Sequence, residues 1–220
     1  PARGLIAAEG GSTHAALMNG IYRRQRVIYD ATRKYYLLGR DHLIRDLDAP
    51  REARILEVAC GTGRNLELIS RRYPGRPLFG LDISSEMLAS AEAKLKGRAQ
   101  LAEADATDFD PQALFGVAAV DRILLSYSVS MIPDWQGAIR SAAGHLAPGG
   151  QLHIVDFGDQ ADLPGWFARL LRGWLAKFHV SPREDLRSVM EALAAEGQGD
   201  VTYQTLYRRY AQYAVLTRAA

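Results

Sequence analysis

The residues best suited to chemistry stand at the end of an apolar run, Ile55-Leu56-Glu57-Val58-Ala59-Cys60-Gly61-Thr62-Gly63. A Gly-x-Gly turn after a buried strand brings the backbone N–H groups of a helix start close to a nucleotide-like ligand. Dinucleotide enzymes use such a turn for a pyrophosphate, which the carboxylate of Glu57 would repel. Leu66 also replaces the third glycine of the dinucleotide fingerprint. The pattern therefore favours a nucleoside with a cationic tail, and S-adenosylmethionine, with a sulfonium and an ammonium, is the commonest such ligand.

Two further acids stand at the ends of the next two predicted strands. Asp82 ends the strand expected over 77–83, and Asp105 follows the strand expected over 99–104. Ligands of an open parallel sheet bind beyond the carboxyl ends of its strands. Asp82 is placed to accept hydrogen bonds from a ribose diol, and Asp105 lies within reach of an adenine amino group. One such acid alone would be typical of a helix cap, but three at successive strand ends indicate a nucleoside site.

These acids require a framework of alternating strands and helices. After the first strand we expect helices over 65–72, 85–95 and 135–146, and strands over 77–83, 99–104, 120–126 and 151–157. Such alternation predicts a parallel sheet with both faces covered. The segments 201–207 and 210–217 indicate an antiparallel hairpin at the end of the sheet. A helical segment over 17–47, broken near Gly39, precedes the first strand, so the fold class is α/β with a seven-stranded, mostly parallel, Rossmann-like sheet.

Length and composition indicate one globular domain of 220 residues, 48% hydrophobic and 24% charged. A net charge of +2 argues against general nucleic-acid binding. Cys60 is the single cysteine, which excludes an intrachain disulfide framework, fits a reducing compartment and makes a cysteine metal site improbable. No secretory pattern or membrane span is recognisable. We therefore expect a cytoplasmic protein without a metal.

The segment before the first strand combines basic and aromatic residues. Seven basic residues stand between Ile21 and Asp46 against three acids. Tyr22, Tyr29 and Tyr36 are seven apart and so fall on nearly one line of a helix. Tyrosine rings attract alkylated ammonium by about 0.5 to 2 kcal/mol each. The tyrosines could instead be ordinary core residues, but their basic surroundings favour a substrate role.

The segment over 164–178 has an apolar stripe at helical spacing. The stripe consists of Trp166, Phe167, Leu170, Leu171, Trp174, Leu175 and Phe178. Arg169 and Arg172 lie on the opposite side, Lys177 lies at the stripe edge, and the segment has no acid. This profile is typical of a helix in a membrane interface. A helix packed on its own domain is the alternative.

Four strings of residues together resemble the class I S-adenosylmethionine-dependent methyltransferases over about 53–160. They are 57–63, Leu81-Asp82-Ile83-Ser84 with Met87-Leu88, Asp105-Ala106, and 146–150. The resemblance implies that Gly61 and Gly63 pack under the methionine part and that Asp82 holds the ribose. The expected cofactor-binding residues are Tyr29, Arg33, Glu57, Ala59, Gly61, Thr62, Gly63, Asn65, Asp82, Ile83, Met87, Asp105, Ala106, Thr107, Ser126 and Tyr127. S-adenosylhomocysteine would be the product of the cofactor.

A second resemblance covers most of the chain. The run 22–41, together with 60–66, 130–133, 155–159 and 178–183, is similar to the bacterial diacylglycerylhomoserine N-methyltransferases of betaine-lipid synthesis. It implies three successive methylations of the homoserine amine, and hence a membrane lipid and an anionic bilayer surface as partners. The protein would then lie peripherally at the inner face of the cell membrane.

Transfer from sulfur to nitrogen needs a neutral amine lone pair in line with the methyl group, so positioning and exclusion of water do most of the work. Tyr22, Tyr29 and Tyr127 are the candidate cage and orienting groups, and His179 is a candidate base beside His14 and Asp30. Phosphatidylethanolamine, a quinone or a small molecule could be the methyl acceptor instead. A cofactor-binding scaffold without catalysis is a further alternative, and oligomeric state stays open.

The chain is expected to divide by role within one domain, 1–220. Residues 1–50 would form a helical substrate segment and 53–160 the cofactor-binding core. Residues 161–195 would form the amphipathic insert and 200–220 the terminal hairpin.

Overall fold

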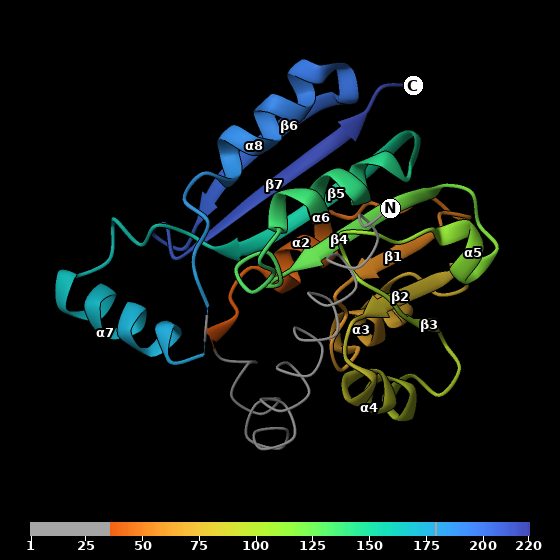
Figure 1. The fold of residues 1–220 in the computed structure, drawn as a ribbon, viewed down its shortest axis with the longest axis horizontal. Coiled ribbons are helices and arrows are strands. Elements are labelled where there is room, and N and C mark those ends of the chain that lie inside the picture. The colour runs from red at the N-terminus through yellow and green to blue at the C-terminus, as the bar shows by residue number, and fades with distance from the viewer. Residues whose placement is uncertain (1–35, 179) are drawn as a thin grey trace, which may run out of the picture.

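The computed structural model describes residues 36–178 and 180–220, and its centre is a seven-stranded sheet (Figure 1). The strands are β1 (Ile55–Val58), β2 (Leu78–Asp82), β3 (Gln100–Glu103), β4 (Val120–Ser126), β5 (Leu146–Phe157), β6 (Gly199–Leu206) and β7 (Ala211–Arg218). Their order across the sheet is β3-β2-β1-β4-β5-β7-β6. β1 to β5 pair in parallel, whereas β7 runs antiparallel to β5 and β6. The predicted mostly parallel sheet with a terminal hairpin is confirmed.

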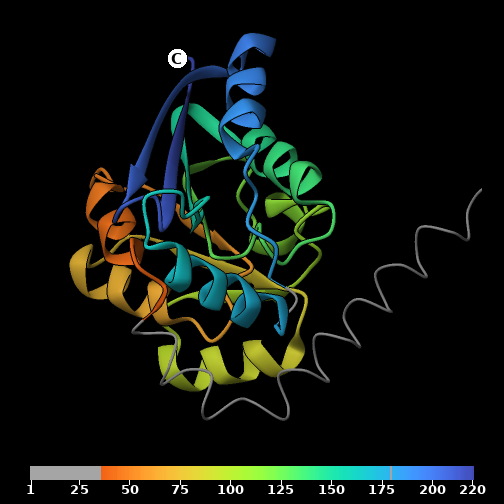
Figure 2. The ribbon, with the colours of Figure 1, turned by 90° about the vertical axis from the view of Figure 1, so that its left-hand side faces the viewer.

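Helices cover the two faces of this sheet (Figure 2). The helices are α2 (Arg40–Asp46), α3 (Arg64–Arg72), α4 (Ser85–Leu95), α5 (Pro111–Phe115), α6 (Trp135–Gly144), α7 (Gly165–Ala176) and α8 (Leu186–Leu193), followed by a π-helical turn, Ala194–Gln198. Buried residues of α2, α3 and α4 pack on one face of the sheet. Those of α6 and α8 pack on the other. The strand ends that carry the acids are therefore held between two separate apolar layers.

Local residues explain where several helices begin. Ser84 caps α4 by accepting from the Met87 N–H, and Asp134 caps α6 by accepting from the Gly137 N–H. Gly39 precedes α2 with a φ of 93°, a left-handed conformation that glycine adopts without strain. The predicted break near Gly39 is confirmed, while the part of that segment before residue 36 lies outside the described residues.

The structure differs from the expectation at the start of β5 and within the segment 161–195. β5 begins at Leu146, five residues before the predicted start, because Val120 pairs with Leu146 and Arg122 pairs with Gln151 across a bulge. The segment 161–195 contains two helices of different character. The buried Leu186, Met190 and Leu193 of α8 pack against the sheet, whereas α7 stands at the left of Figure 1, beyond the strand ends. Within the described residues, no helix is both long and apolar enough to cross a bilayer.

Candidate active site

The loop after β1 is shaped by residues with positive φ. Ala59, Gly61 and Gly63 have φ values of 55°, 54° and 71°. Gly63 begins α3, and a Cβ atom at this position would lie 3.0 Å from the Ala91 Cβ. Glycine is thus required at residue 63 both by the backbone conformation and by the close approach of α4.

Asp82 ties this loop to the end of β2. One of its carboxylate oxygens accepts from the Gly61 N–H at 2.8 Å and the other from the Ser84 N–H at 2.9 Å. The side chain is only 8% exposed. A carboxylate has about four acceptor sites, so Asp82 can accept further hydrogen bonds from a diol placed beside it.

A pocket of about 270 Å³, here called the Asp82 pocket, opens at these strand ends. It is lined by Ala59, Leu81, Asp82, Ile83, Ala104, Asp105, Ala106, Thr107, Ile132, Pro133 and Asp134. Six of the predicted cofactor-binding residues are among them. Asp105 is held in position because its Oδ1 accepts from the Thr107 N–H at 2.9 Å and the Thr107 hydroxyl at 2.7 Å. The pocket therefore combines apolar walls with three oriented carboxylates, those of Asp82, Asp105 and Asp134, and this combination suits a nucleoside.

Glu57 lies buried behind the loop. Its Oε1 accepts from Asn65 Nδ2 at 2.7 Å, and its Oε2 has no hydrogen-bond partner among the described residues. Burial raises the pKa of Glu57 to about 8, and the nearby Arg40 opposes the rise. A cation placed near Glu57 would favour its ionised form. The unsatisfied oxygen is thus suited to a ligand with a positive tail.

The other predicted cofactor-binding residues occupy three settings. Thr62 is buried, and its hydroxyl accepts from Lys94 Nζ at 3.2 Å. Met87 is 1% exposed and packs in the first turn of α4, outside the set that lines the Asp82 pocket. Ser126 ends β4, where its hydroxyl is buried without a partner among the described residues.

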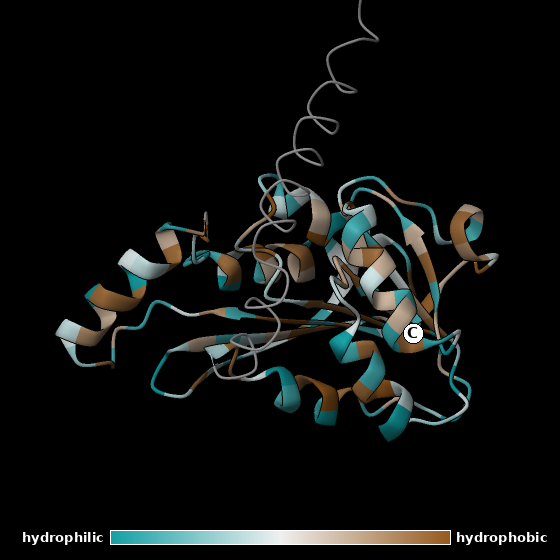
Figure 3. Cartoon of the chain, turned by 90° about the horizontal axis from the view of Figure 1, so that it is seen from below, coloured by the Kyte–Doolittle hydropathy of each residue, from teal (hydrophilic) through white to brown (hydrophobic). Residues whose placement is uncertain are grey.

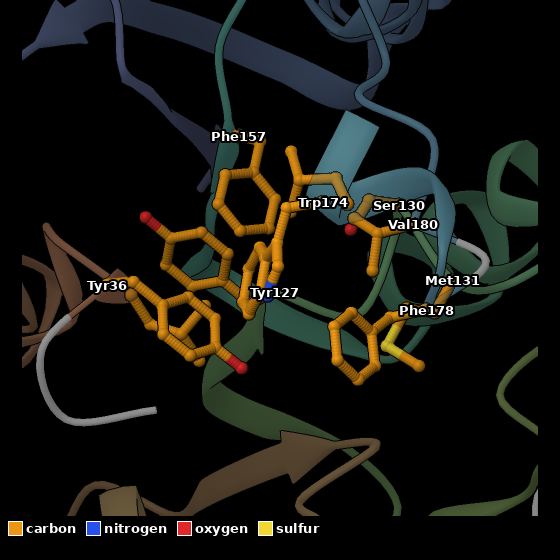
Figure 4. Close-up of a pocket in the computed structure, with 10 residues that line it drawn as sticks. Tyr36, Tyr127, Ser130, Met131, Phe157, Trp174, Phe178 and Val180 are labelled. Atoms are coloured by element: carbon orange, nitrogen blue, oxygen red, sulfur yellow. The ribbon is translucent and has the colours of Figure 1, made fainter. Parts of the chain in front are cut away.

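Aromatic rings line a second, smaller pocket of about 20 Å³, here called the aromatic pocket (Figure 4). Its rings are those of Tyr36, Tyr127, Phe157, Trp174 and Phe178. Trp174 contacts Tyr36 edge to face with centroids 4.6 Å apart and Phe178 at 4.9 Å. Tyr127 contacts Phe157 at 4.7 Å. Rings from the segment before α2, the end of β4, β5 and the region of α7 thus surround one small space.

The aromatic pocket and the Asp82 pocket share the loop between β4 and α6. Ser130 and Met131 line the former, and the next residues, Ile132 and Pro133, line the latter. Behind Ser130 lies the fully buried Asp156, whose oxygens accept from the backbone N–H groups of Ser130 and Phe157 at 3.1 and 2.7 Å. Burial raises the pKa of Asp156 to about 6. A carboxylate behind the wall favours positive charge in the aromatic pocket.

Tyr127 has its hydroxyl committed elsewhere. The hydroxyl donates to the Leu38 carbonyl, and burial raises its pKa well above the ordinary value. The ring, by contrast, is part of the aromatic pocket. Any contribution of Tyr127 to catalysis must therefore come from its ring face.

The remaining predicted site residues lie outside the described residues. These are Tyr22, Tyr29, Arg33 and His179, together with His14 and Asp30. Sequence reasoning did not assign Phe157, Trp174 or Phe178 to the site, although Trp174 and Phe178 belong to the apolar stripe it singled out. Within the described part of the chain, no three His, Cys, Asp or Glu side chains are grouped to hold a metal ion.

The order of the sheet and the position of the Asp82 pocket are those of a Rossmann-like methyltransferase fold. Residues 55–150 match the family model described as a methyltransferase domain. This part of the chain, somewhat less than half of it, is therefore a methyltransferase domain, and its cofactor is S-adenosylmethionine.

Three individual proteins that resemble this chain share a third of its residues or fewer over the aligned part. The chain is similar to trans-aconitate 2-methyltransferase of Variovorax paradoxus, at 33% identity over 112 residues, 51% of this chain and 41% of that protein. The enzyme of the same name from Afipia carboxidovorans is 32% identical over 166 residues, 74% of this chain and 60% of that protein. The chain thus spans less than two thirds of these curated relatives. The crystal structure of the plantazolicin methyltransferase BpumL, with a desmethylPZN analog and SAH, matches with a TM-score of 0.73 at 15% identity over 97% of each chain.

Proposed function

We propose that this chain is an N-methyltransferase that acts on the amine of a membrane lipid. Its substrate would be diacylglycerylhomoserine, which three successive methylations convert to the trimethylated betaine lipid. The observation that carries the proposal is the aromatic pocket beside the Asp82 pocket, separated from it by the residues 130–133. Aromatic faces bind alkylated ammonium by cation–π contact.

The described residues can divide the work of transfer between them. When bound, the cofactor would supply the methyl group: an N–CH3 bond forms as the S–CH3 bond breaks, and S-adenosylhomocysteine leaves. Before each transfer the ammonium of the substrate would release its proton to water, so that a neutral lone pair faces the methyl group. Asp82 and Asp105 would orient the nucleoside, and the rings of Tyr36, Tyr127 and Trp174 would hold the amine and exclude water. Because the aromatic pocket, at about 20 Å³, has room for about one water molecule, these rings must move apart for an alkylated amine to enter. Positioning of this kind supplies a large part of the rate enhancement in a displacement without covalent intermediates.

Helix α7 supports a membrane-bound substrate. Trp166 and Leu170 are each 66% exposed, and the basic Arg169 and Arg172 lie on the same helix. Exposed tryptophan beside arginine is typical of a helix at an anionic lipid surface. We therefore propose that the protein lies peripherally at the inner face of the cell membrane.

A small-molecule methyltransferase is the second candidate, because the curated relatives are named for trans-aconitate. An anionic acid of this kind needs basic side chains around it. Among the described residues that line the Asp82 pocket and the aromatic pocket, none is Lys, Arg or His. The lining therefore favours a cationic product over an anionic substrate.

A panel of methyl acceptors tests the proposal. The purified chain would be incubated with S-adenosylmethionine carrying a labelled methyl group and, separately, with diacylglycerylhomoserine vesicles, phosphatidylethanolamine vesicles, trans-aconitate or a demethylated quinone. Label in the homoserine lipid alone is the expected result. Label in trans-aconitate or the quinone, with none in either lipid, would contradict it.

A further inference from the structure

A third cavity lies between α7 and the turn that joins β6 to β7. This cavity, here called the α7 groove, has a volume of about 590 Å³, within the range of ligand sites. Its lining consists of Tyr36, Leu38, Leu163, Phe167, Leu170, Leu171, Trp174, Tyr207 and Tyr210. None of these described lining residues is charged. The groove is therefore suited to a long apolar ligand rather than to a polar head group.

The α7 groove and the aromatic pocket are neighbours that share two lining residues. Tyr36 and Trp174 line both cavities, and their rings meet edge to face. The Tyr210 hydroxyl donates to the Tyr36 carbonyl at 2.7 Å, which fixes Tyr36 against the hairpin. A molecule with its amine in the aromatic pocket would thus have its apolar part directed toward the groove.

The outer rim of the groove carries the large apolar side chains that the described chain exposes. These are Trp166, Leu170 and Tyr207, at 66%, 66% and 52% exposure. The Trp166 ring packs against Phe167 with centroids 5.7 Å apart. Figure 3 shows apolar segments along α7, at the left of the view. Exposed apolar residues at the mouth of an apolar groove are typical of a surface that binds a membrane or an apolar ligand.

Positive charge surrounds this rim. Arg169 and Arg208 are exposed and form no ion pair with the described residues. Arg172 lies 3.9 Å from Glu184, and Arg209 pairs with Asp159. Basic side chains around an apolar mouth match the anionic surface of a bilayer. A positively charged or uncharged surface would leave Arg169 and Arg208 without ionic partners.

The turn that forms one wall of the groove is held in an unusual conformation. Tyr207, Arg208 and Arg209 have φ values of 53°, 58° and 61°, although none is glycine. Such a backbone costs of order 1 kcal/mol or more per residue. The Gln160 N–H donates to the Arg209 carbonyl at 2.9 Å, and Asp159 binds the Arg209 guanidinium. These contacts keep Tyr207 at the groove mouth with Arg208 beside it.

We propose that the α7 groove takes one acyl chain of a bilayer lipid. The inference extends the proposed function, because the same lipid would place its amine in the aromatic pocket. The chain enters at the rim formed by Trp166, Leu170 and Tyr207. It passes Phe167 and ends against Tyr36 and Trp174.

Binding of a monomeric fatty acid tests the groove without vesicles and without methyl transfer. The probe is cis-parinaric acid, whose fluorescence is excited by energy transfer from tryptophan. Saturable binding of one molecule to each chain of 220 residues is expected. Leu170→Gln should weaken binding about fivefold, because the groove loses an apolar contact.

Ala176→Gln is the control, since Ala176 is exposed on the same helix, belongs neither to the rim nor to the groove lining, and is not a tryptophan that excites the probe. It should change the affinity for the probe less than twofold. Equal weakening by the two variants, or no saturable binding, would overturn the proposal. Displacement of the probe by a branched polyprenol but not by an oleoyl lysophospholipid would also overturn it, because the groove would then fit an isoprenoid tail.

The groove and the proposed function can fail separately. Saturable probe binding that Leu170→Gln weakens, with no methyl transfer to any amine lipid, would support the groove and remove the lipid-amine substrate. Methyl transfer to homoserine lipid without probe binding, at equal rates for short and long acyl chains, would support the lipid-amine substrate and overturn the acyl-chain groove.

Discussion

Gly61 donates its backbone N–H to the Asp82 carboxylate over 2.8 Å, and this hydrogen bond joins the glycine loop after β1 to the end of β2. The two residues are 21 positions apart in the sequence. The bond fixes the loop at the edge of the Asp82 pocket and orients the carboxylate there. We propose that this one side chain both shapes the loop and binds the ribose of the cofactor.

Replacement of Asp82 tests this double role. In Asp82→Asn one of the two acceptors becomes an NH₂ group that faces a backbone N–H, at a cost of about 1 to 3 kcal/mol. We expect the dissociation constant for S-adenosylmethionine, measured by calorimetry, to rise at least tenfold. Asp108→Asn, at an exposed position outside the pocket lining, is the control and should bind normally. Normal affinity in Asp82→Asn would exclude Asp82 from cofactor binding.

Glu57 predicts a pH dependence of stability. Its pKa is about 8 in the fold against 4.5 ordinarily, so between these values the unfolded chain holds fewer protons and stability falls as pH rises. Asp156 adds to this fall only up to its pKa of about 6. His153, whose pKa burial lowers to about 3, acts in the opposite direction, and only below its ordinary value of 6.5.

Between pH 6.5 and 8 the decline thus belongs to Glu57, with a slope of at most about 1.4 kcal/mol per pH unit. Glu57→Gln should flatten the free energy of unfolding over this range in urea titrations. Glu103→Gln, at an exposed position of β3, should leave the slope intact. A wild-type slope that persists in Glu57→Gln would show that another group titrates.

The aromatic pocket predicts a selective loss of turnover. Trp174→Leu removes a ring that contacts both Tyr36 and Phe178, which should lower kcat/KM for the amine about tenfold, or roughly 1.4 kcal/mol. Cofactor affinity should stay within twofold, because Trp174 does not line the Asp82 pocket. Phe115→Leu removes an aromatic contact to Phe79 outside the aromatic pocket and should keep kcat/KM. Equal losses in the two variants would indicate a general effect on packing.

The basic rim predicts salt-sensitive binding to membranes. The double variant Arg169→Gln/Arg208→Gln removes two positive charges. At low salt its affinity for phosphatidylglycerol vesicles, measured by sedimentation, should fall roughly thirtyfold, which corresponds to about 2 kcal/mol of binding free energy. Arg51→Gln/Lys96→Gln removes the same charge elsewhere and serves as the control. Binding that ignores salt and lipid charge would contradict the electrostatic part of the proposal.

The positions of Asp82 and Asp105 at neighbouring strand ends could be predicted from the sequence because their context is local. Asp82 and Asp105 follow apolar strands directly, and parallel strands bring their carboxyl ends to one edge. The terminal hairpin is predicted separately, from the two strand segments 201–207 and 210–217 joined by a short turn, and the structure confirms it.

The aromatic pocket could not be predicted because it depends on distant contacts. Tyr36 and Trp174 are separated by more than half the chain and meet only when α7 folds back toward β5. Likewise, the spacing of residues near Tyr127 does not indicate that its hydroxyl binds Leu38, 89 positions earlier. The early start of β5 depends on a bulge against β4 that strand propensity does not describe.

The most direct test is mass spectrometry of one reaction mixture. The chain would be incubated with S-adenosylmethionine and mixed vesicles that contain diacylglycerylhomoserine and phosphatidylethanolamine, and each added methyl group would be resolved. Mono-, di- and trimethylated homoserine lipid, with phosphatidylethanolamine unchanged, is the predicted result. Methylated phosphatidylethanolamine with unchanged homoserine lipid would contradict the proposed head group, and no methylated lipid at all would contradict the lipid-amine function.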